Sequence, residues 1–484
     1  MGLTLDPTVR SKLGQFMTPA PVASFMAGFF GPLPRHVRLL DAGAGLGSLT
    51  AAFVHEACAR QEKPASIDVT AFEIDRDLAG HLETTLANCA VECERANVEF
   101  SSRIIRDDFI LHSGEPLIGR HERPDCYNCA ILNPPYAKLN VGSSWRRALR
   151  QLSIETSNLY TAFIGVALHQ LSPGGQMVAI TPRSFCNGSY FEPFRRLLLS
   201  TSAIERIHVY ESRKKAFQDD DVLQENVIYR VTKSTPQTAH VEISSSHGPS
   251  AEILIRSVPF EEVVQPSDPH CFIRLLTTDW ESDLTRRVMN LPAMLKDLRI
   301  TVSTGRVVDF RAKGQLRKLP EPGTVPLIYP AHFERGFVAW PKLEGRKPNA
   351  LTLDEFTADQ VVPRGTYVLT KRFTSKEERR RVVAAIYDPA RVTAEYVGFE
   401  NHLNYFHCSG GGLDPLFARG LAVYLNSTAV DQFFRLFSGH TQVNATDLRN
   451  LPYPSIADLE AMGHSVGDIM PDQEAIDQVV SALV

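Results

Sequence analysis

Four consecutive residues, Asn133, Pro134, Pro135 and Tyr136, combine the groups needed to hold an amine. They follow an apolar run from Cys126 to Leu132 that is typical of a strand, and the prolines end that run because proline cannot donate to a sheet. The Asn133 side chain and the Pro134 carbonyl then offer two rigid hydrogen-bond acceptors beside the Tyr136 ring. An exocyclic amine on a planar base can donate both hydrogens to these acceptors while the base stacks on the ring. Taken alone, the motif is also compatible with a tight turn after a strand.

A glycine loop precedes this motif. The segment from Val37 to Asp41 is typical of a buried strand, and it leads into Gly43, Gly45 and Gly47 before a helix expected from Ser48 to Arg60. Glycines let the backbone turn sharply and let a ligand approach the amides at a helix N-terminus. By itself, this loop is compatible with a dinucleotide, with S-adenosylmethionine or with tight packing only.

Acidic residues follow the next two expected strands. The strand from Ser66 to Phe72 ends at Glu73, where an acid is suited to holding a ribose diol. The strand from Val98 to Ile105 ends at Asp107 and Asp108. Open α/β sheets bind ligands at the carboxyl ends of their strands. Four successive strands therefore end in polar residues that can share one ligand site: Asp41, Glu73, Asp108 and Asn133.

Strands and helices alternate through the first half of the chain, which predicts an open α/β sheet wound on both faces. Before the first strand, Thr18 can cap a helix expected from Pro21 to Phe30, and Pro19 suits its first turn. The 484 residues allow two or three domains. We expect a first domain over residues 1–240 and a second over residues 241–484, separated near the polar segment from Lys233 to Gln237.

The composition predicts a cytoplasmic protein. Hydrophobic residues make up 43% of the chain and charged residues 22%, as in ordinary globular proteins. The apolar stretch from Val22 to Leu33 is too short to span a bilayer, which needs about 20 residues. Eight scattered cysteines fit a reducing compartment. Cys126 and Cys129 form a CxxC pair without a second pair of matching spacing, so we expect core packing here and no metal.

Two segments of the second half are strongly basic although the net charge of the chain is −4. They run from Arg299 to Lys318 and from Arg364 to Arg381. A charge run is usually a solvated face, and a basic helix from Ser375 to Ala385 would provide one. Two such segments in one half of the chain also suit a cleft lined by phosphates.

In their order along the chain, the motifs resemble those of the S-adenosylmethionine-dependent amino-methyltransferases. More narrowly they resemble the TaqI-type, γ-class DNA adenine-N6 methyltransferases of restriction-modification systems. The resemblance covers residues 10–232, and residues 425–454 more loosely resemble target-recognition domains. The motifs that carry it are Gly14–Pro19, Asp41–Gly47, Phe72–Asp75, Asp107–Phe109, Asn133–Tyr136 and Asn158–Phe163. The resemblance implies a doubly wound, Rossmann-like methyltransferase domain followed by a mixed α+β target-recognition domain.

The same resemblance implies a set of cofactor contacts with S-adenosyl-L-methionine. Asp41 and the glycine loop would approach the methionine portion, Glu73 the ribose hydroxyls, and Ile74 the adenine ring. Asp108, beside Phe109, would accept from the adenine amino group, although Asp107 could replace it. The residues implied at the methionine end are Phe16, Thr18 and Pro19.

For the substrate, the resemblance implies an adenine flipped out of duplex DNA. Asn133 and Pro134 would accept the two N6 hydrogens, and Pro135 would hold the turn rigid. Tyr136 would stack on one face of the base and Phe217, in a polar loop before the last strand of this half, on the other. Phe217 could equally be an ordinary loop aromatic that covers the edge of the core.

In the second half, we expect contacts between the protein and double-stranded DNA. The candidates for phosphate contacts are Arg306, Arg311, Lys371, Arg372, Arg379, Arg380 and Arg381. Asn401, His402 and Asn404 could read base edges. The chain has no Walker A motif and no nuclease pattern, so the resemblance implies a separately encoded restriction endonuclease as genetic partner.

Several alternatives remain open at this stage. A DNA cytosine-N4 or RNA adenine-N6 methyltransferase fits the same acceptor geometry. A protein-glutamine methyltransferase also fits, because the glutamine amide is planar, but it would not need a long basic second half. A non-catalytic DNA-binding subunit that keeps the fold is the fourth alternative.

Overall fold

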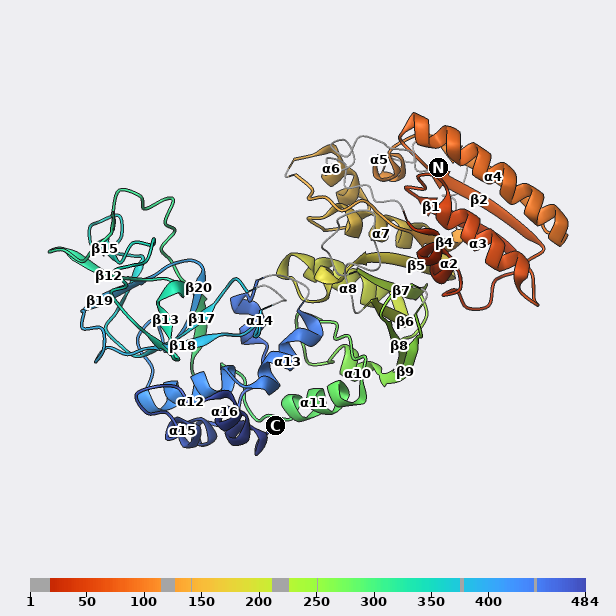
Figure 1. Cartoon of the computed structure of the whole chain (residues 1–484). Coiled ribbons are helices and arrows are strands. Elements are labelled where there is room, and N and C mark those ends of the chain that lie inside the picture. The colour runs from red at the N-terminus through yellow and green to blue at the C-terminus, as the bar shows by residue number, and fades with distance from the viewer. Residues whose placement is uncertain are drawn as a thin grey trace. The chain divides into compact units, whose positions relative to one another are not determined.

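The structure is a computed structural model, and it describes residues 18–114, 127–140, 142–210, 226–249, 251–374, 378–438 and 442–484. The chain divides into two compact units, Met1–Thr278 and Asp279–Val484, each shown in Figure 1. The sequence suggested a boundary at residue 240, whereas the first unit extends to Thr278, because β8 and β9 join its sheet. No helix among the described residues is both long and apolar enough to cross a membrane.

The described part of the first unit contains one nine-stranded sheet in the order β3-β2-β1-β4-β5-β7-β6-β8-β9. The first five strands in this order, which are β3, β2, β1, β4 and β5, run parallel to one another. Strand β7 is antiparallel to both of its neighbours, β5 and β6. The strands are β1 (His36–Ala42), β2 (Ser66–Phe72), β3 (Glu99–Ile105), β4 (Tyr127–Leu132), β5 (Leu171–Pro182), β6 (Ser202–Tyr210), β7 (Asn226–Lys233), β8 (His240–Ser246) and β9 (Leu254–Pro259).

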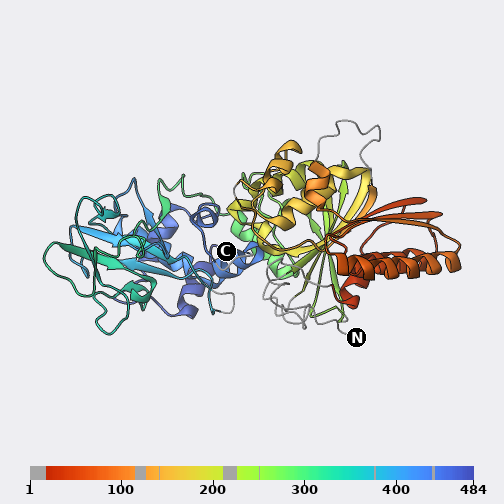
Figure 2. The same cartoon turned by 90° about the horizontal axis from the view of Figure 1, so that it is seen from above.

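Two groups of helices cover the two faces of this sheet, as Figure 2 shows. One group is α2 (Ala20–Ala27), α3 (Ser48–Ala59) and α4 (Arg76–Ala96). The other is α5 (Phe109–Gly114), α6 (Ser144–Gln151), α7 (Leu159–Gln170) and α8 (Glu192–Thr201), with the short turns η1 (Arg183–Cys186) and η2 (Ser189–Phe191), and α10 (Phe260–Val263) follows β9. The expected doubly wound α/β arrangement is therefore confirmed.

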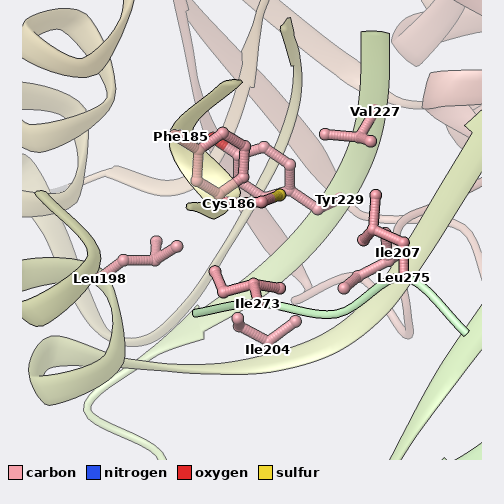
Figure 3. A pocket seen from close by; sticks show the side chains of 9 residues that line it. All are labelled: Phe185, Cys186, Leu198, Ile204, Ile207, Val227, Tyr229, Ile273 and Leu275. Carbon is pink, nitrogen blue, oxygen red and sulfur yellow. The ribbon is translucent and has the colours of Figure 1, made fainter. Parts of the chain in front are cut away.

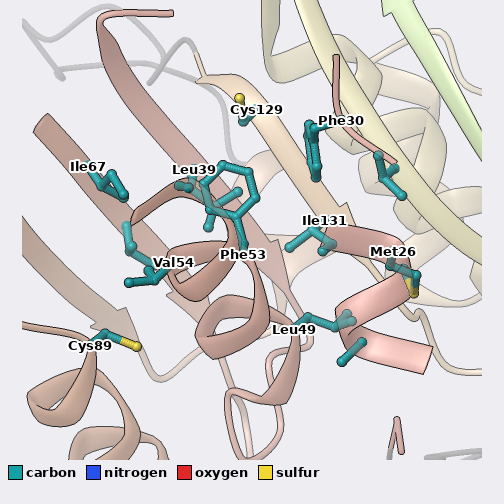
Figure 4. Close-up of a cluster of buried hydrophobic side chains, with 14 of the residues drawn as sticks. Met26, Phe30, Leu39, Leu49, Phe53, Val54, Ile67, Cys89, Cys129 and Ile131 are labelled. Atoms are coloured by element: carbon teal, nitrogen blue, oxygen red, sulfur yellow. The ribbon is translucent and has the colours of Figure 1, made fainter. Parts of the chain in front are cut away.

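The main core of the first unit lies between α2, α3 and the parallel strands. Met26, Phe53, Leu39 and Ile131 are all buried there, and Figure 4 shows them on facing elements. The register fixes where the strands end: Asp41 pairs with Ala71 on β2 and with Ile131 on β4. Because these parallel strands end at nearly the same level, the polar residues that follow them share one edge of the sheet.

The second unit contains a six-stranded sheet, β10-β20-β17-β18-β14-β13, and a five-stranded sheet, β11-β15-β12-β19-β16. Helices pack with them, so the expected mixed α+β architecture is confirmed. The strands are β10 (Thr301–Thr304), β11 (Leu316–Arg317), β12 (Thr324–Ile328), β13 (Phe333–Glu334), β14 (Phe337–Val338), β15 (Ala350–Thr352), β16 (Val361–Pro363), β17 (Tyr367–Lys371), β18 (Ala384–Tyr387), β19 (Tyr396–Phe399) and β20 (Leu403–His407). The helices are α11 (Asp279–Met289), α12 (Pro415–Leu425), α13 (Thr428–Phe437), α14 (Ala445–Arg449), α15 (Ile456–Gly463) and α16 (Gln473–Ser481), with the short turn η3 (Pro330–His332).

One alternative for the second basic segment was a solvated helix from Ser375 to Ala385, and for the described residues of that segment it is wrong. Residues 378–383 form no helix, and Ala384 begins β18. Two adjacent β-branched residues, Val382 and Val383, favour extended backbone at this point.

Candidate active site

The glycine loop between β1 and α3 is pinned to the end of β2. The amides of Gly43 and Ala44 both donate to the Phe72 carbonyl (3.0 and 2.9 Å), and the Gly45 amide donates to the Glu73 carboxylate (2.8 Å). Gly47, with a φ of 82°, starts α3, and a β-carbon there would lie 2.7 Å from the Leu82 side chain on α4. This glycine is therefore required by both backbone conformation and helix packing.

Asp41 is a fully buried acid at the end of β1. One carboxylate oxygen accepts from the Thr50 hydroxyl (2.6 Å), while the other has no hydrogen-bond partner among the described residues. Burial raises the pKa of Asp41 to about 7; the Thr50 bond opposes this shift and the nearby Glu73 charge adds to it. A buried acceptor without a partner is costly. The site thus has an acceptor ready for a ligand that brings a donor or a positive charge.

Glu73, at the end of β2, is buried and held by backbone amides. Its two oxygens accept from the amides of Gly45 and Asp75, both at 2.8 Å. Burial raises the pKa of Glu73, and these backbone bonds oppose the shift. An ionised carboxylate has lone pairs for further donors, so this geometry still suits a diol. The next residue, Ile74, leaves 59% of its surface exposed, which offers an apolar face beside the acid.

Asp108 caps α5 in this structure. One oxygen accepts from the Leu111 amide (2.9 Å) and the other from the Trp145 indole nitrogen on α6 (2.8 Å). Phe109 is buried, and its ring packs against those of Phe72 (4.9 Å between centroids) and Phe163 (5.3 Å). No sequence motif marks Trp145, because its contact with Asp108 depends on how α5 and α6 pack.

Asp107 is the more exposed member of the acidic pair. One of its oxygens accepts from the Asp108 amide (2.7 Å), and the other lies 3.2 Å from the His112 ring. Both aspartates therefore lie just after the carboxyl end of β3, and the choice between Asp107 and Asp108 as the expected acceptor stays open.

The Asn133 amide is fixed on both sides. Its nitrogen donates to the Thr18 hydroxyl (2.9 Å), and its oxygen accepts from the Tyr136 hydroxyl (3.0 Å). The Tyr136 ring meets the edge of Tyr160 (6.0 Å, 82°), which in turn packs on Phe191 (5.6 Å). The Asn133 amide is thus oriented both by its neighbour Tyr136 and by Thr18, 115 positions earlier in the chain, so the arrangement is more than a turn after a strand.

Thr18 differs from its expected role as a helix cap. Pro19 occupies the N-cap of α2, no side chain caps this helix, and the Thr18 hydroxyl contacts Asn133 instead. Pro134 is buried and Pro135 half-buried, directly after β4. Phe16, Phe217 and Cys126 lie outside the described residues. Cys129 is buried in the core, as expected.

Several basic side chains expected to meet DNA are accessible. Arg306, Arg311 and Arg379 are exposed. The Arg306 guanidinium donates to the Asp359 carbonyl (2.9 Å), and that of Arg311 lies 5.6 Å from the Phe310 ring. Half-buried candidates are Lys371, Arg372, Asn401 and His402.

Three other candidates hold the second unit together. The buried Arg381 guanidinium donates to the Ser438 hydroxyl (3.0 Å), and that of Arg380, which is half-buried, to the Asn426 side chain (3.2 Å). Asn404 is fully buried and donates to the Val443 carbonyl (2.8 Å). Both side chains are buried and bonded inside the unit, which favours a structural role over the expected phosphate contact of Arg381 and base contact of Asn404.

No group of three or more histidine, cysteine or acidic side chains in the described ranges has a geometry that could hold a metal ion. One enclosed cavity of about 10 Å³ in the first unit is lined by apolar side chains, as Figure 3 shows. Its lining includes Phe185, Ile204, Val227 and Tyr229. This volume is at the lower limit for a single water molecule, so the cavity is no candidate for a ligand site.

Comparisons with known proteins agree on one group. The family model described as Eco57I restriction-modification methylase matches residues 79–217. Type II methyltransferase M.PstI of Providencia stuartii is 46% identical, covering 99% of this chain and 94% of that protein. Type II methyltransferase M.BsuBI of Bacillus subtilis is 45% identical, with 95% and 92% covered. The solved type IIL restriction-modification enzyme MmeI shares the fold, with a TM-score of 0.56, 11% identity, and 93% of this chain and 70% of that chain covered.

Proposed function

The chain belongs to the type II restriction-modification methyltransferases, and from this premise we propose that it transfers a methyl group from S-adenosyl-L-methionine to N6 of an adenine in duplex DNA. The observation that carries the proposal is the Asn133 amide held between Thr18 and Tyr136 at the carboxyl end of β4. Such an amide is preorganised, so aligning it with a reacting amine costs little free energy.

Asn133 and Pro134 act on the amine itself. The N6 lone pair of adenine is delocalised into the ring, which makes the nitrogen a poor nucleophile. Acceptance of one hydrogen by the Asn133 oxygen and of the other by the Pro134 carbonyl favours a pyramidal nitrogen with its lone pair directed outward. A carbonyl oxygen has two lone pairs, and the Asn133 oxygen accepts from the Tyr136 hydroxyl in this structure.

The first strands provide groups that fit the cofactor. When bound, S-adenosylmethionine supplies an electrophilic methyl group on a sulfonium centre. The unpartnered Asp41 oxygen suits the positively charged methionine end, and Glu73 suits the ribose hydroxyls. The exposed Ile74 side chain suits an adenine ring, with Asp108 or Asp107 as acceptor for its amino group.

A base inside a duplex cannot reach this site, so the target adenine would have to leave the helix stack. Tyr136 is the described aromatic beside the two acceptors, and it would stack on one face of the base. Phe217, outside the described residues, stays our proposal for the other face. In the second unit, the exposed Arg306, Arg311 and Arg379 are the proposed phosphate contacts, and the expected genetic partner is an endonuclease with the same target.

The test is a methyl-transfer assay on the full chain with labelled S-adenosylmethionine and plasmid DNA. Digestion to nucleosides and mass spectrometry should find N6-methyladenine as the product. N4-methylcytosine would instead assign the acceptors to cytosine. Label recovered only in RNA or protein would refute the DNA substrate, and cofactor binding without any transfer would indicate a non-catalytic DNA-binding subunit.

A further inference from the structure

We infer that the turn Glu400–Leu403 of the second unit is a base-reading element, in which His402 contacts a base edge and Phe373 makes an apolar contact beside it. In this arrangement, Glu400 is a positioning residue that orients His402. The inference rests on the proposed function, since it names the residues through which the enzyme would choose its DNA site.

The turn is held rigidly between the two sheets of the unit. It connects β19 with β20 and is closed by the bond from the Leu403 amide to the Glu400 carbonyl (2.9 Å). The neighbouring chain crosses so closely that a β-carbon on Gly305 would lie 2.2 Å from the Glu400 carbonyl oxygen. The Asn401 amide bonds to the Val307 carbonyl on this crossing segment (2.9 Å). A side chain on this turn is therefore presented with little freedom.

Glu400 is a carboxylate buried completely inside the unit. Its two oxygens accept from the backbone amide of His402 (2.9 Å) and from the Nδ1 atom of the His402 ring. Burying a carboxylate costs free energy unless it is well paired, and here both partners belong to one residue. The arrangement fixes the ring by its Nδ1 side.

The other side of the His402 ring is available. The side chain is 45% exposed, and no bond to Nε2 occurs within the described parts of the chain. With Nδ1 engaged, Nε2 is the remaining polar atom of the ring. A fixed hydrogen-bonding atom on a rigid turn is the requirement for direct readout of a base edge.

Phe373 extends the same surface. Its side chain is 41% exposed and its ring lies 4.8 Å from that of His402, at 45°. Arg372, the preceding residue, ties the two together: its amide donates to the His402 carbonyl (2.8 Å) and its guanidinium to the Asn401 carbonyl (3.2 Å). This guanidinium also lies 5.6 Å from the Phe373 ring. An aromatic surface beside a polar ring and a cation suits the edge of a base pair, which offers hydrogen-bonding atoms beside apolar groups such as the thymine methyl.

The experiment reads the sequence context of methylated adenines after the full chain has acted on a plasmid library with random inserts. The variants are His402→Ala, Phe373→Ala and Glu400→Gln. Tyr396→Ala is the matched control, because Tyr396 is an aromatic of similar exposure (43%) at the far end of β19. We expect His402→Ala to reduce the preference at one base pair of the target by roughly 10- to 100-fold, as for loss of a base contact.

Phe373→Ala and Glu400→Gln should weaken the preference at that position or the adjacent one, whereas Tyr396→Ala should match wild type. A purely structural role of Glu400 would lower the melting temperature without changing the preference at a single position. Unchanged preferences in His402→Ala would overturn the inference. So would a loss of affinity that is equal for all sequences and accompanied by a smaller salt slope, because that result identifies a phosphate contact. If the wild type methylates no DNA, the proposed function itself fails.

Discussion

Each unit of the molecule contains a completely buried carboxylate, and the two are used differently. Asp41 in the first unit has one oxygen bonded to Thr50 and one with no partner in the described structure. Glu400 in the second unit has both oxygens bonded to His402. Both burials cost free energy. The first leaves an acceptor for a ligand, while the second uses all of its bonding to hold a neighbouring side chain.

This difference separates two kinds of function. An unsatisfied acceptor beside a glycine loop indicates ligand binding, so changes around it should affect affinity for the cofactor or the rate. A satisfied acid behind an exposed histidine indicates orientation, so changes there should affect the choice of DNA site. The following experiments test whether rate and site choice divide between the units in this way.

The largest effect is expected for Asn133→Ala. Removal of the preorganised acceptor should lower turnover by at least about 100-fold, the scale for loss of one such transition-state contact. Cofactor affinity and the sequence preference of the residual activity should stay as in wild type. Single-turnover kinetics measure turnover, calorimetry measures cofactor affinity, and the sequence context of methylated adenines gives the preference. Asn140→Ala is the control, since Asn140 is an exposed asparagine that follows the same motif; near-normal turnover of Asn133→Ala would remove Asn133 from the site.

The second prediction compares Arg381 with Arg379, two arginines of the same basic segment for which the sequence predicts the same phosphate-contacting role. Arg381→Ala should destabilise the protein by about 2–4 kcal/mol, because it removes a buried cation with its bond to Ser438 and its contact with the Phe434 ring (5.9 Å). Arg379→Ala should leave stability unchanged but reduce the salt slope of DNA binding by about 0.9 if it touches one phosphate. Urea denaturation and binding titrations at several salt concentrations measure both. Equal stability of the two variants would contradict the burial argument.

The third prediction concerns Asp41→Asn and pH. Burial raises the pKa of Asp41 from 3.8 to about 7, so between these values the folded state binds more protons than the unfolded state. Wild-type stability attributable to this group therefore falls as pH rises through that window. The neutral amide removes this penalty, and without ligand the variant should gain about 1–4 kcal/mol relative to wild type between pH 4 and pH 7. It should also bind the cofactor more weakly. A pH-independent difference in the free energy of unfolding would refute the raised pKa.

The fold and much of the first site were predictable from the sequence. The ends of β1 to β4 follow from apolar runs punctuated by glycine, acid or proline, and these runs also set the register that aligns Asp41 with Ile131. The contact between Thr18 and Asn133 was not predictable, because it joins residues 115 positions apart. A threonine before a proline looks like a helix cap when only local sequence is considered. In the structure the Thr18 hydroxyl instead accepts from the Asn133 side chain, a contact that the local sequence does not show.

The second unit was harder to predict for a physical reason. A run of charges specifies neither burial nor partners, so Arg379 and Arg381 are indistinguishable in sequence although one is exposed and the other buried. Asn404 and His402 also differ in exposure, because His402 lies in the turn before β20 whereas Asn404 lies within this strand, between β10 and β17. Glu400 gave no signal at all, since a single acid directly after a strand becomes informative only when its partner is known.

The smallest effect is expected at the apolar cavity of the first unit, which tests whether empty space there has a function. Val227→Ile adds one methylene toward this cavity of about 10 Å³ and should stabilise the protein by up to about 0.8 kcal/mol, the value of one buried CH₂ group. Val241→Ile is the control, because Val241 is equally buried but does not line the cavity; overpacking there should cost about 1–3 kcal/mol. Both free energies of unfolding follow from urea denaturation, and turnover should be unchanged for Val227→Ile. A loss of activity without loss of stability would show that the cavity, despite its apolar lining, is coupled to the site.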